Sequence, residues 1–144
     1  MMIDELTEHV IGLGMVVHTA LGPGLLESIY RDCLAMELVA NGLLVEAERP
    51  VPIFYRGERV RDDLRLDLLV DCRLVIEVKA VEHLLQVHRA QVVSYLKLSG
   101  FEAGLILNFN VPSLREGIRR VDHPEVYERK RQERLKEMVR KRTS

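Results

Sequence analysis

Glu77 and Lys79 are two charged residues inside residues 74–81, a stretch whose other six members are all apolar. Four of those six are β-branched, and this composition predicts a buried β-strand. Side chains two positions apart in a strand point to the same face, so the carboxylate and the ammonium lie together. Because an unpaired charge in a dry interior is very costly, the same face must hold partners for both groups.

Asp67 is the first such partner. A turn centred at Cys72 places residues whose numbers sum to 144 opposite each other, which pairs Asp67 with Glu77. Cβ atoms of directly opposed residues are about 4.5–5.5 Å apart. Two carboxylates at that separation repel unless a cation lies between them, and Mg²⁺ binds to a few carboxylates plus water and substrate oxygens. Lys79 could then contact a metal-bound water or a phosphate. The alternative is a plain salt bridge between Asp67 and Lys79.

Two further polar pairs occur at helical spacing. Glu27 and Tyr30 are three residues apart, and Gln91 and Tyr95 are four residues apart, so each pair projects from one side of its helix. Taken alone, Glu27 near the start of a helix is explained by its favourable interaction with the helix macrodipole. Gln91 and Tyr95 taken alone are typical of an exposed helix face.

Hydrophobic periodicity and turn residues predict the elements that carry these groups. We expect helices over residues 4–20, 25–40 and 84–98, strands over 44–55, 58–70, 74–81 and 103–109, an edge strand over 117–121, and a charged helix over 124–144. Pro50 and Pro52 favour an edge position for the first strand. In the second, Leu64, Leu66 and Leu68 alternate with Arg65, Asp67 and Leu69, which predicts a half-buried strand. Residues 1–122 are expected to form one domain, followed by a basic helical extension over 123–144.

Composition narrows the class of protein. The chain has 144 residues, 47% apolar and 30% charged, which suits one globular domain. A net charge of −1 does not by itself indicate a nucleic-acid-binding protein. No apolar run approaches the ~18 residues of a membrane helix, and no secretory signal is recognised, so no membrane partner is expected. Cys33 and Cys72 are too few and too far apart for a disulfide framework or a zinc site, which favours free thiols in the cytoplasm.

Four motifs together resemble the GxxExxY protein family of the PD-(D/E)XK nuclease-like superfamily. They are Gly24-x-x-Glu27-x-x-Tyr30, Asp67, Glu77-x-Lys79 and Gln91-x-x-x-Tyr95, and the resemblance extends from about residue 6 to residue 121. The sequences of residues 18–27 and 90–100 are close to those usual in that family. Glu-x-Lys alone would carry almost no information, whereas four motifs in order at compatible spacing are specific. The resemblance implies an α/β fold with an α-β-β-β-α-β restriction-endonuclease-like core and a mixed sheet flanked by helices, in agreement with the predicted element order.

The resemblance also implies a role for each residue. Asp67 and Glu77 would bind a catalytic Mg²⁺ or Mn²⁺, and Glu27 would complete the acidic cluster directly or through water. Lys79 would orient the attacking water and stabilise charge at the phosphate. The expected catalytic set is therefore Glu27, Asp67, Glu77, Lys79, Gln91 and Tyr95, the last two positioning water, lysine or phosphate. Leu66 stands where the superfamily's namesake proline would precede Asp67.

The implied function is a metal-dependent nuclease that hydrolyses phosphodiester bonds, with DNA rather than RNA as the expected substrate. The alternative is a catalytically silent nuclease-fold protein that acts as a nucleic-acid or protein binding and assembly module, because fold does not imply function. The basic helix over residues 124–144 could contact phosphates, remain solvated or join two chains into a homodimer. His88, one turn before Gln91, could approach the site, although a structural histidine is the simpler interpretation.

Overall fold

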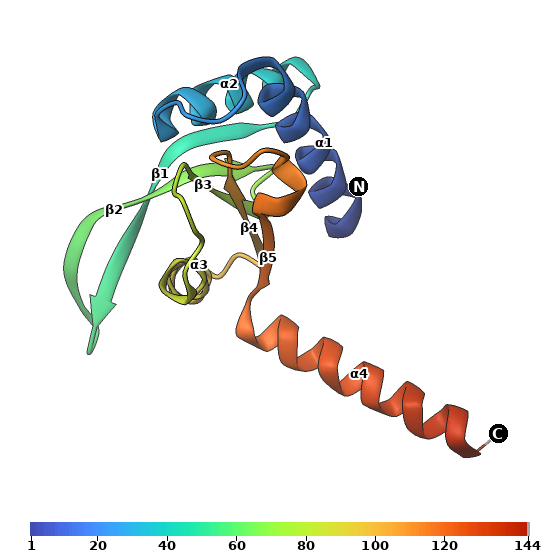
Figure 1. Ribbon diagram of the computed structural model, residues 1–144. Coiled ribbons are helices and arrows are strands. Elements are labelled where there is room, and N and C mark those ends of the chain that lie inside the picture. Colours follow the sequence, from blue (N-terminus) through green and yellow to red (C-terminus); the bar gives the residue numbers. More distant parts are fainter. Residues whose placement is uncertain (144) are drawn as a thin grey trace.

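The computed structural model describes residues 1–143, and its elements follow the predicted order (Figure 1). The elements are α1 (Ile3–Leu21), α2 (Glu27–Ala40), β1 (Val45–Tyr55), β2 (Glu58–Val70), β3 (Leu74–Lys79), α3 (Gln86–Ser99), β4 (Ala103–Asn108), a 3₁₀ turn (Leu114–Gly117), β5 (Ile118–Asp122) and α4 (Pro124–Thr143). Ser144, the last residue of the predicted C-terminal helix, lies outside the described residues. Within residues 1–143, no helix is both long and apolar enough to cross a membrane.

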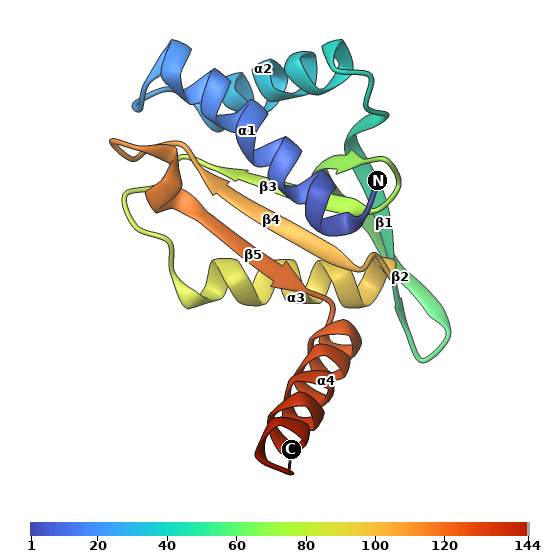
Figure 2. The same cartoon turned by 90° about the vertical axis from the view of Figure 1, so that its right-hand side faces the viewer.

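The five strands form one mixed sheet in the order β1-β2-β3-β4-β5. Only β3 and β4 are parallel, and the other neighbours are antiparallel. Helix α3 connects the parallel pair and covers one face of the sheet, while α1 and α2 cover the other (Figure 2). The predicted mixed sheet flanked by helices is confirmed. Strand β1, which contains Pro50 and Pro52, is at one edge as predicted, and β5 is at the other.

Strand β3 separates two hydrophobic cores, because its side chains alternate between the faces of the sheet. Its even-numbered residues enter the larger core with α1 and α2, and these are Leu74, Ile76 and Val78. Val75 points to the opposite face and packs in the smaller core with Val92 and Leu96 of α3. Period-2 geometry therefore directs Glu77 and Lys79 to the α3 side of the sheet.

Strand β2 differs from the half-buried strand that its alternation predicted. Its first half, residues 58–63, is exposed throughout, whereas Leu68, Leu69 and Val70 are all buried. Leu69 was expected on the solvent side but is only 1% exposed, because it joins the core under α3. The strand thus runs from an exposed hairpin into a sheet covered on both faces.

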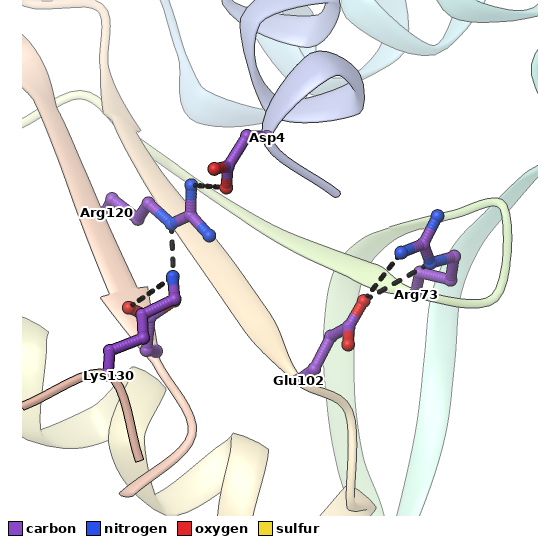
Figure 3. A network of polar contacts seen from close by, with 6 residues as sticks. Asp4, Arg73, Glu102, Arg120 and Lys130 are labelled. Atoms are coloured by element: carbon purple, nitrogen blue, oxygen red, sulfur yellow. Dashed lines mark hydrogen bonds and ion pairs between the residues drawn. The ribbon is translucent and has the colours of Figure 1, made fainter. Parts of the chain in front are cut away.

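Helix α4 leaves the body of the molecule after β5 and has no buried residue (Figures 1 and 2). Pro124 is its first residue, as predicted. Figure 3 shows the ion pair between Asp4 and Arg120 close to Lys130, and the ion pair between Arg73 and Glu102. Arg120 and Lys130 also form ion pairs with Asp122. Asp122 accepts both Arg120 and Lys130, so the first turns of α4 are joined to β5. From residue 131 to residue 143 every side chain is exposed.

Candidate active site

The predicted pairing of Asp67 with Glu77 follows from the register of β2 and β3. Their paired residues are Leu68–Ile76, Leu69–Val75 and Val70–Leu74, each summing to 144. Beyond Leu68 the two strands are no longer paired backbone to backbone. Hydrogen bonds from backbone N–H groups to the carboxylates of Asp67 and Glu77 take the place of that pairing. The N–H of Asp67 donates to Glu77 Oε1 at 3.2 Å, and the N–H of Val78 donates to Asp67 Oδ2 at 2.9 Å. The two acidic side chains therefore lie where β2 begins to leave β3.

Glu77 is a buried acid, with only 5% of its surface exposed. Burial and then the negative charge of Asp67 raise the pKa of its carboxyl group to about 8, although Lys79 acts in the opposite direction. A hydrogen bond between the Asp67 and Glu77 carboxyl groups also raises this pKa. A cation between the two carboxyl groups would offset their mutual repulsion.

The pKa of the Asp67 carboxyl group is also raised. Burial raises the pKa of Asp67, and the negative charge of Glu27 adds to this effect. The N–H of Val78 and the cations Lys79 and Arg31 lower it, but the net direction is upward. Glu27 therefore lies close enough to Asp67 for their charges to interact. We refer to Glu27, Asp67 and Glu77 as the carboxylate cluster.

Glu27 enters the cluster from the opposite face of the sheet. It is the first residue of α2, which begins two residues later than the predicted start at residue 25, because Leu26 is still extended (φ −72°, ψ 147°). Its Oε1 accepts a hydrogen bond of 3.2 Å from the N–H of Ala80, just beyond the end of β3. The carboxylate is thereby held at the carboxyl end of the strand that carries Glu77 and Lys79.

Tyr30 fixes the loop that brings Glu27 there. Its buried ring stacks on Phe109 with 4.6 Å between ring centres. Its hydroxyl donates to the Gly22 carbonyl at 2.6 Å and accepts from the N–H of Leu25 at 3.1 Å. Gly24 in the same loop has φ +100°, a conformation that favours glycine. The Gly and Tyr of the motif therefore shape the approach to Glu27 rather than join the cluster.

Lys79 and two residues of α3 complete the group. Lys79 Nζ donates to Gln91 Oε1 at 3.4 Å, so the ammonium is directed by the helix. Burial raises the pKa of Tyr95, and the negative charges of Glu77 and Asp67 raise it further, which places its hydroxyl near both. The i, i+4 spacing of Gln91 and Tyr95 thus brings both to the strand face that holds the acids.

The structure adds two residues that sequence reasoning missed. Arg31, one helical turn after Glu27, lowers the pKa of Asp67 and forms an ion pair with Glu48 at 3.3 Å. Its i+4 spacing from Glu27 could have revealed it. Buried Asn108 clamps the chain after β3, since its side chain accepts from the N–H of Val81 at 3.0 Å and donates to the Val81 carbonyl at 2.9 Å. A polar residue in an otherwise apolar strand was the available signal.

His88 has a structural role. Its Nδ1 accepts a hydrogen bond of 2.9 Å from the N–H of Leu85, which caps the start of α3. This agrees with the simpler interpretation of that histidine. In the described part of the chain, no group of three or more His, Cys, Asp or Glu residues is already arranged to hold a metal ion.

The donor chemistry of the carboxylate cluster nevertheless suits a hard cation. Asp67 and Glu77 each place one oxygen on a backbone N–H, which fixes the direction of both carboxylates. Burial and then the neighbouring negative charges raise the pKa values of both groups, and a divalent cation would offset both effects. Carboxylate oxygens are the ligands that Mg²⁺ and Mn²⁺ prefer. Asp67, Glu77 and then Glu27 are the residues that could hold such an ion.

Comparison with known proteins gives one family match. A model of the PD-(D/E)XK nuclease superfamily matches residues 4–121. No match was found among curated proteins or among solved structures. The matched residues include every element from α1 to β5 except the first residue of α1 and the last of β5, whereas α4 lies beyond them.

Proposed function

The chain belongs to the PD-(D/E)XK nuclease superfamily, and on that premise we propose that it is a divalent-metal-dependent nuclease that hydrolyses phosphodiester bonds, with DNA as the expected substrate. The observation that supports this best is the convergence of Asp67, Glu77 and Lys79 where β2 leaves β3. An acidic pair beside an ammonium is what phosphodiester hydrolysis needs, because it combines a cation site with a charge that can face a phosphate.

Each residue has a defined task in this proposal. Asp67 and Glu77, with Glu27, would hold Mg²⁺ or Mn²⁺, and that ion would lower the pKa of a bound water and draw charge from a phosphate oxygen. Lys79 would stabilise the negative charge that develops on the phosphate, and the 3.4 Å contact with Gln91 keeps its ammonium in place. Tyr95 has a raised pKa and therefore keeps its proton, so it can donate a hydrogen bond to the phosphate.

The test is the Lys79→Ala variant. It should fold normally but lose at least ~100-fold in metal-dependent cleavage, because one preorganised charge at a phosphate contributes on that order. Purified protein is assayed on plasmid, linear duplex, single-stranded DNA and RNA, with and without Mn²⁺. Lys97→Ala is the matched control, since Lys97 is an exposed lysine on α3, and it should retain wild-type activity. Full activity in Lys79→Ala would overturn the catalytic assignment of that residue.

A calorimetric titration separates the nuclease from the catalytically silent alternative. Wild type should bind Mg²⁺ or Mn²⁺, and Asp67→Ala should bind at least ~10-fold more weakly because it removes one of two central carboxylates. Asp62→Ala removes an exposed carboxylate in the β1–β2 hairpin and should leave metal affinity unchanged. Absence of metal binding by wild type would favour the binding module, and unchanged binding by Asp67→Ala would remove Asp67 from the metal site.

A further inference from the structure

The outer part of the β1–β2 hairpin, residues 52–61, extends away from the body of the molecule; we call it the hairpin arm (Figures 1 and 2). Arg56 and Gly57 form its turn with φ values of 51° and 79°. Two left-handed residues in succession match a tight two-residue hairpin turn. Cross-strand pairing continues to Tyr55–Glu58. The arm is thus ordered by backbone pairing, although residues 54–61 are all exposed.

Aromatic side chains are scarce in this chain, yet two lie next to each other at the tip of the arm. The chain has three Phe, four Tyr and no Trp. Phe54 is 56% exposed and Tyr55 is 65% exposed. Burying such a side chain would add about 1.5–3 kcal/mol to the free energy of unfolding, and neither exposed ring provides this stabilisation. Because consecutive strand residues point to opposite faces, each face of the tip carries one ring.

Each ring is accompanied by an arginine. The Arg56 guanidinium lies 5.5 Å from the centre of the Tyr55 ring, and within residues 1–143 it forms no ion pair. Arg59 is opposite Phe54 in the hairpin register. Its ion pair with Asp62 at 3.5 Å joins two well-exposed side chains, so it is weak. Arginine beside an exposed ring is the combination that holds unpaired nucleic-acid bases, through stacking and charge.

The arm is continuous with the candidate active site. Strand β2 runs from Glu58 at the tip to Asp67 in the carboxylate cluster, with two register shifts in its pairing with β1 on the way. Nine strand residues at ~3.3 Å each span at most roughly 30 Å. A stacked nucleic-acid strand advances ~3.4 Å per nucleotide, so at most roughly nine nucleotides separate the two places.

We propose that the hairpin arm is a stacking platform for unpaired bases of the strand whose backbone lies at the carboxylate cluster. This inference rests on the proposed function for the identity of the ligand as nucleic acid. It assigns the substrate class: single-stranded nucleic acid, or a duplex with a single-stranded tail. Fully paired bases cannot offer their faces to Phe54 and Tyr55, so a blunt duplex gains nothing from the arm.

Fluorescence anisotropy with labelled single-stranded DNA of about 20 nucleotides, in EDTA, tests the proposal on the full chain without any cleavage. Phe54→Ala and Tyr55→Ala should each weaken binding about five- to 150-fold, because base stacking on an aromatic side chain is worth ~1–3 kcal/mol. Tyr55→Phe should bind like wild type, whereas Tyr55→Leu, which keeps apolar area but loses the ring, should bind like Tyr55→Ala. Val60→Ala is the matched control, an exposed apolar residue of the same arm, and should change affinity less than twofold.

Probe length and strandedness sharpen the test. A four-nucleotide probe cannot reach from the cluster to the tip, so the difference between wild type and Tyr55→Ala should be largest with the longer probe and absent with a blunt duplex. Unchanged affinity in both alanine variants overturns the proposal, as does an equal loss on blunt duplex. A dimer seen by light scattering for wild type and lost in Phe54→Ala also overturns it, because the rings would then contact a second copy.

Failure of this proposal differs from failure of the proposed function. If wild type cleaves nucleic acid but the arm variants bind normally, the platform is wrong and the nuclease stands. If wild type binds single strands through the arm but cleaves no substrate with Mn²⁺, the platform stands and the nuclease is wrong.

Discussion

At the scale of single residues, Glu77 determines how stability should depend on pH. Its carboxyl pKa is raised from 4.5 to about 8 by burial and by Asp67. The unfolded chain holds this carboxyl at its ordinary pKa, so between those two pH values the folded protein binds more protons than the unfolded chain. Without metal, the free energy of unfolding should therefore fall as pH rises through this window, and the loss should be complete above pH 8.

Glu77→Gln should remove this fall, because the amide does not titrate and its oxygen can still accept the N–H of Asp67. At pH 8.5 in EDTA we expect the variant to be more stable than wild type by about 2 kcal/mol, discounted from the full pKa difference because Asp67 and Glu77 titrate together. Urea denaturation at pH 5 and pH 8.5 measures the effect. Glu58→Gln, at an exposed position, serves as control, and an equal pH dependence in wild type and Glu77→Gln would contradict the prediction.

Sequence reasoning reached part of the candidate site by geometry. The period of a strand and the position of the Cys72 turn were enough to bring Asp67, Glu77 and Lys79 together. Glu27 and Gln91 entered only through family resemblance, since they come from helices on opposite faces of the sheet and no local pattern reports a contact across that distance. Arg31 was missed for the same reason, because its effect on Asp67 depends on how α2 lies over the sheet.

At the scale of elements, the predicted order was correct because this chain has clear proline and glycine signals where helices and strands begin and end. Prolines marked the edge strand, and Gly100 (φ +81°) ends α3. The error at Leu69 shows the limit of alternation as a signal. A period-2 pattern predicts one buried face, but whether the second face is covered depends on α3, which follows β3 in the chain. Leu69 of β2 is buried because the crossover helix α3 covers that face of the sheet, and the sequence of β2 alone does not report this.

The first turn of α2 illustrates a second limit. Propensity allowed the helix to start near residue 25, but Leu26 is extended (φ −72°, ψ 147°), so the helix starts at Glu27. The loop before it contains the left-handed Gly24, and the N–H of Leu25 donates to the Tyr30 hydroxyl. A shift of two residues decides where the carboxylate of Glu27 lies, so an uncertainty that is harmless for the fold is large for the site.

At the scale of the whole molecule, charge is divided unequally. Residues 124–144 contain eight Lys and Arg against four Glu, a net charge of +4. The whole chain has 21 basic and 22 acidic residues, so residues 1–123 contain 13 and 18, a net charge of −5. The near-zero net charge of the whole chain is therefore the sum of an acidic body, residues 1–123, and a basic C-terminal segment, residues 124–144. An acidic body repels nucleic acid as a whole, which leaves α4 as the element best able to attract phosphates.

Truncation after residue 123 tests both this role and the proposal that residues 1–122 form a domain of their own. The truncated chain should fold cooperatively with a Tm lowered by about 4 °C or less, because α4 buries no residue and the Lys130–Asp122 ion pair is partly exposed. Its affinity for DNA should fall, and the slope of log affinity against log salt should become shallower by about 2 to 3 if three or four phosphate contacts are lost.

The matched control separates phosphate contacts from dimerisation. Replacing Leu135 and Met138 by alanine in the full chain removes exposed apolar area from α4 but keeps all its charges. If α4 contacts phosphates, this variant should show the wild-type salt slope, measured by anisotropy between 50 and 200 mM salt. If α4 instead joins two chains, light scattering should show the truncated and alanine variants as monomers beside a dimeric wild type, with the salt slope unchanged. That second result would contradict the phosphate role, because the charges would then matter less than the apolar side chains of Leu135 and Met138.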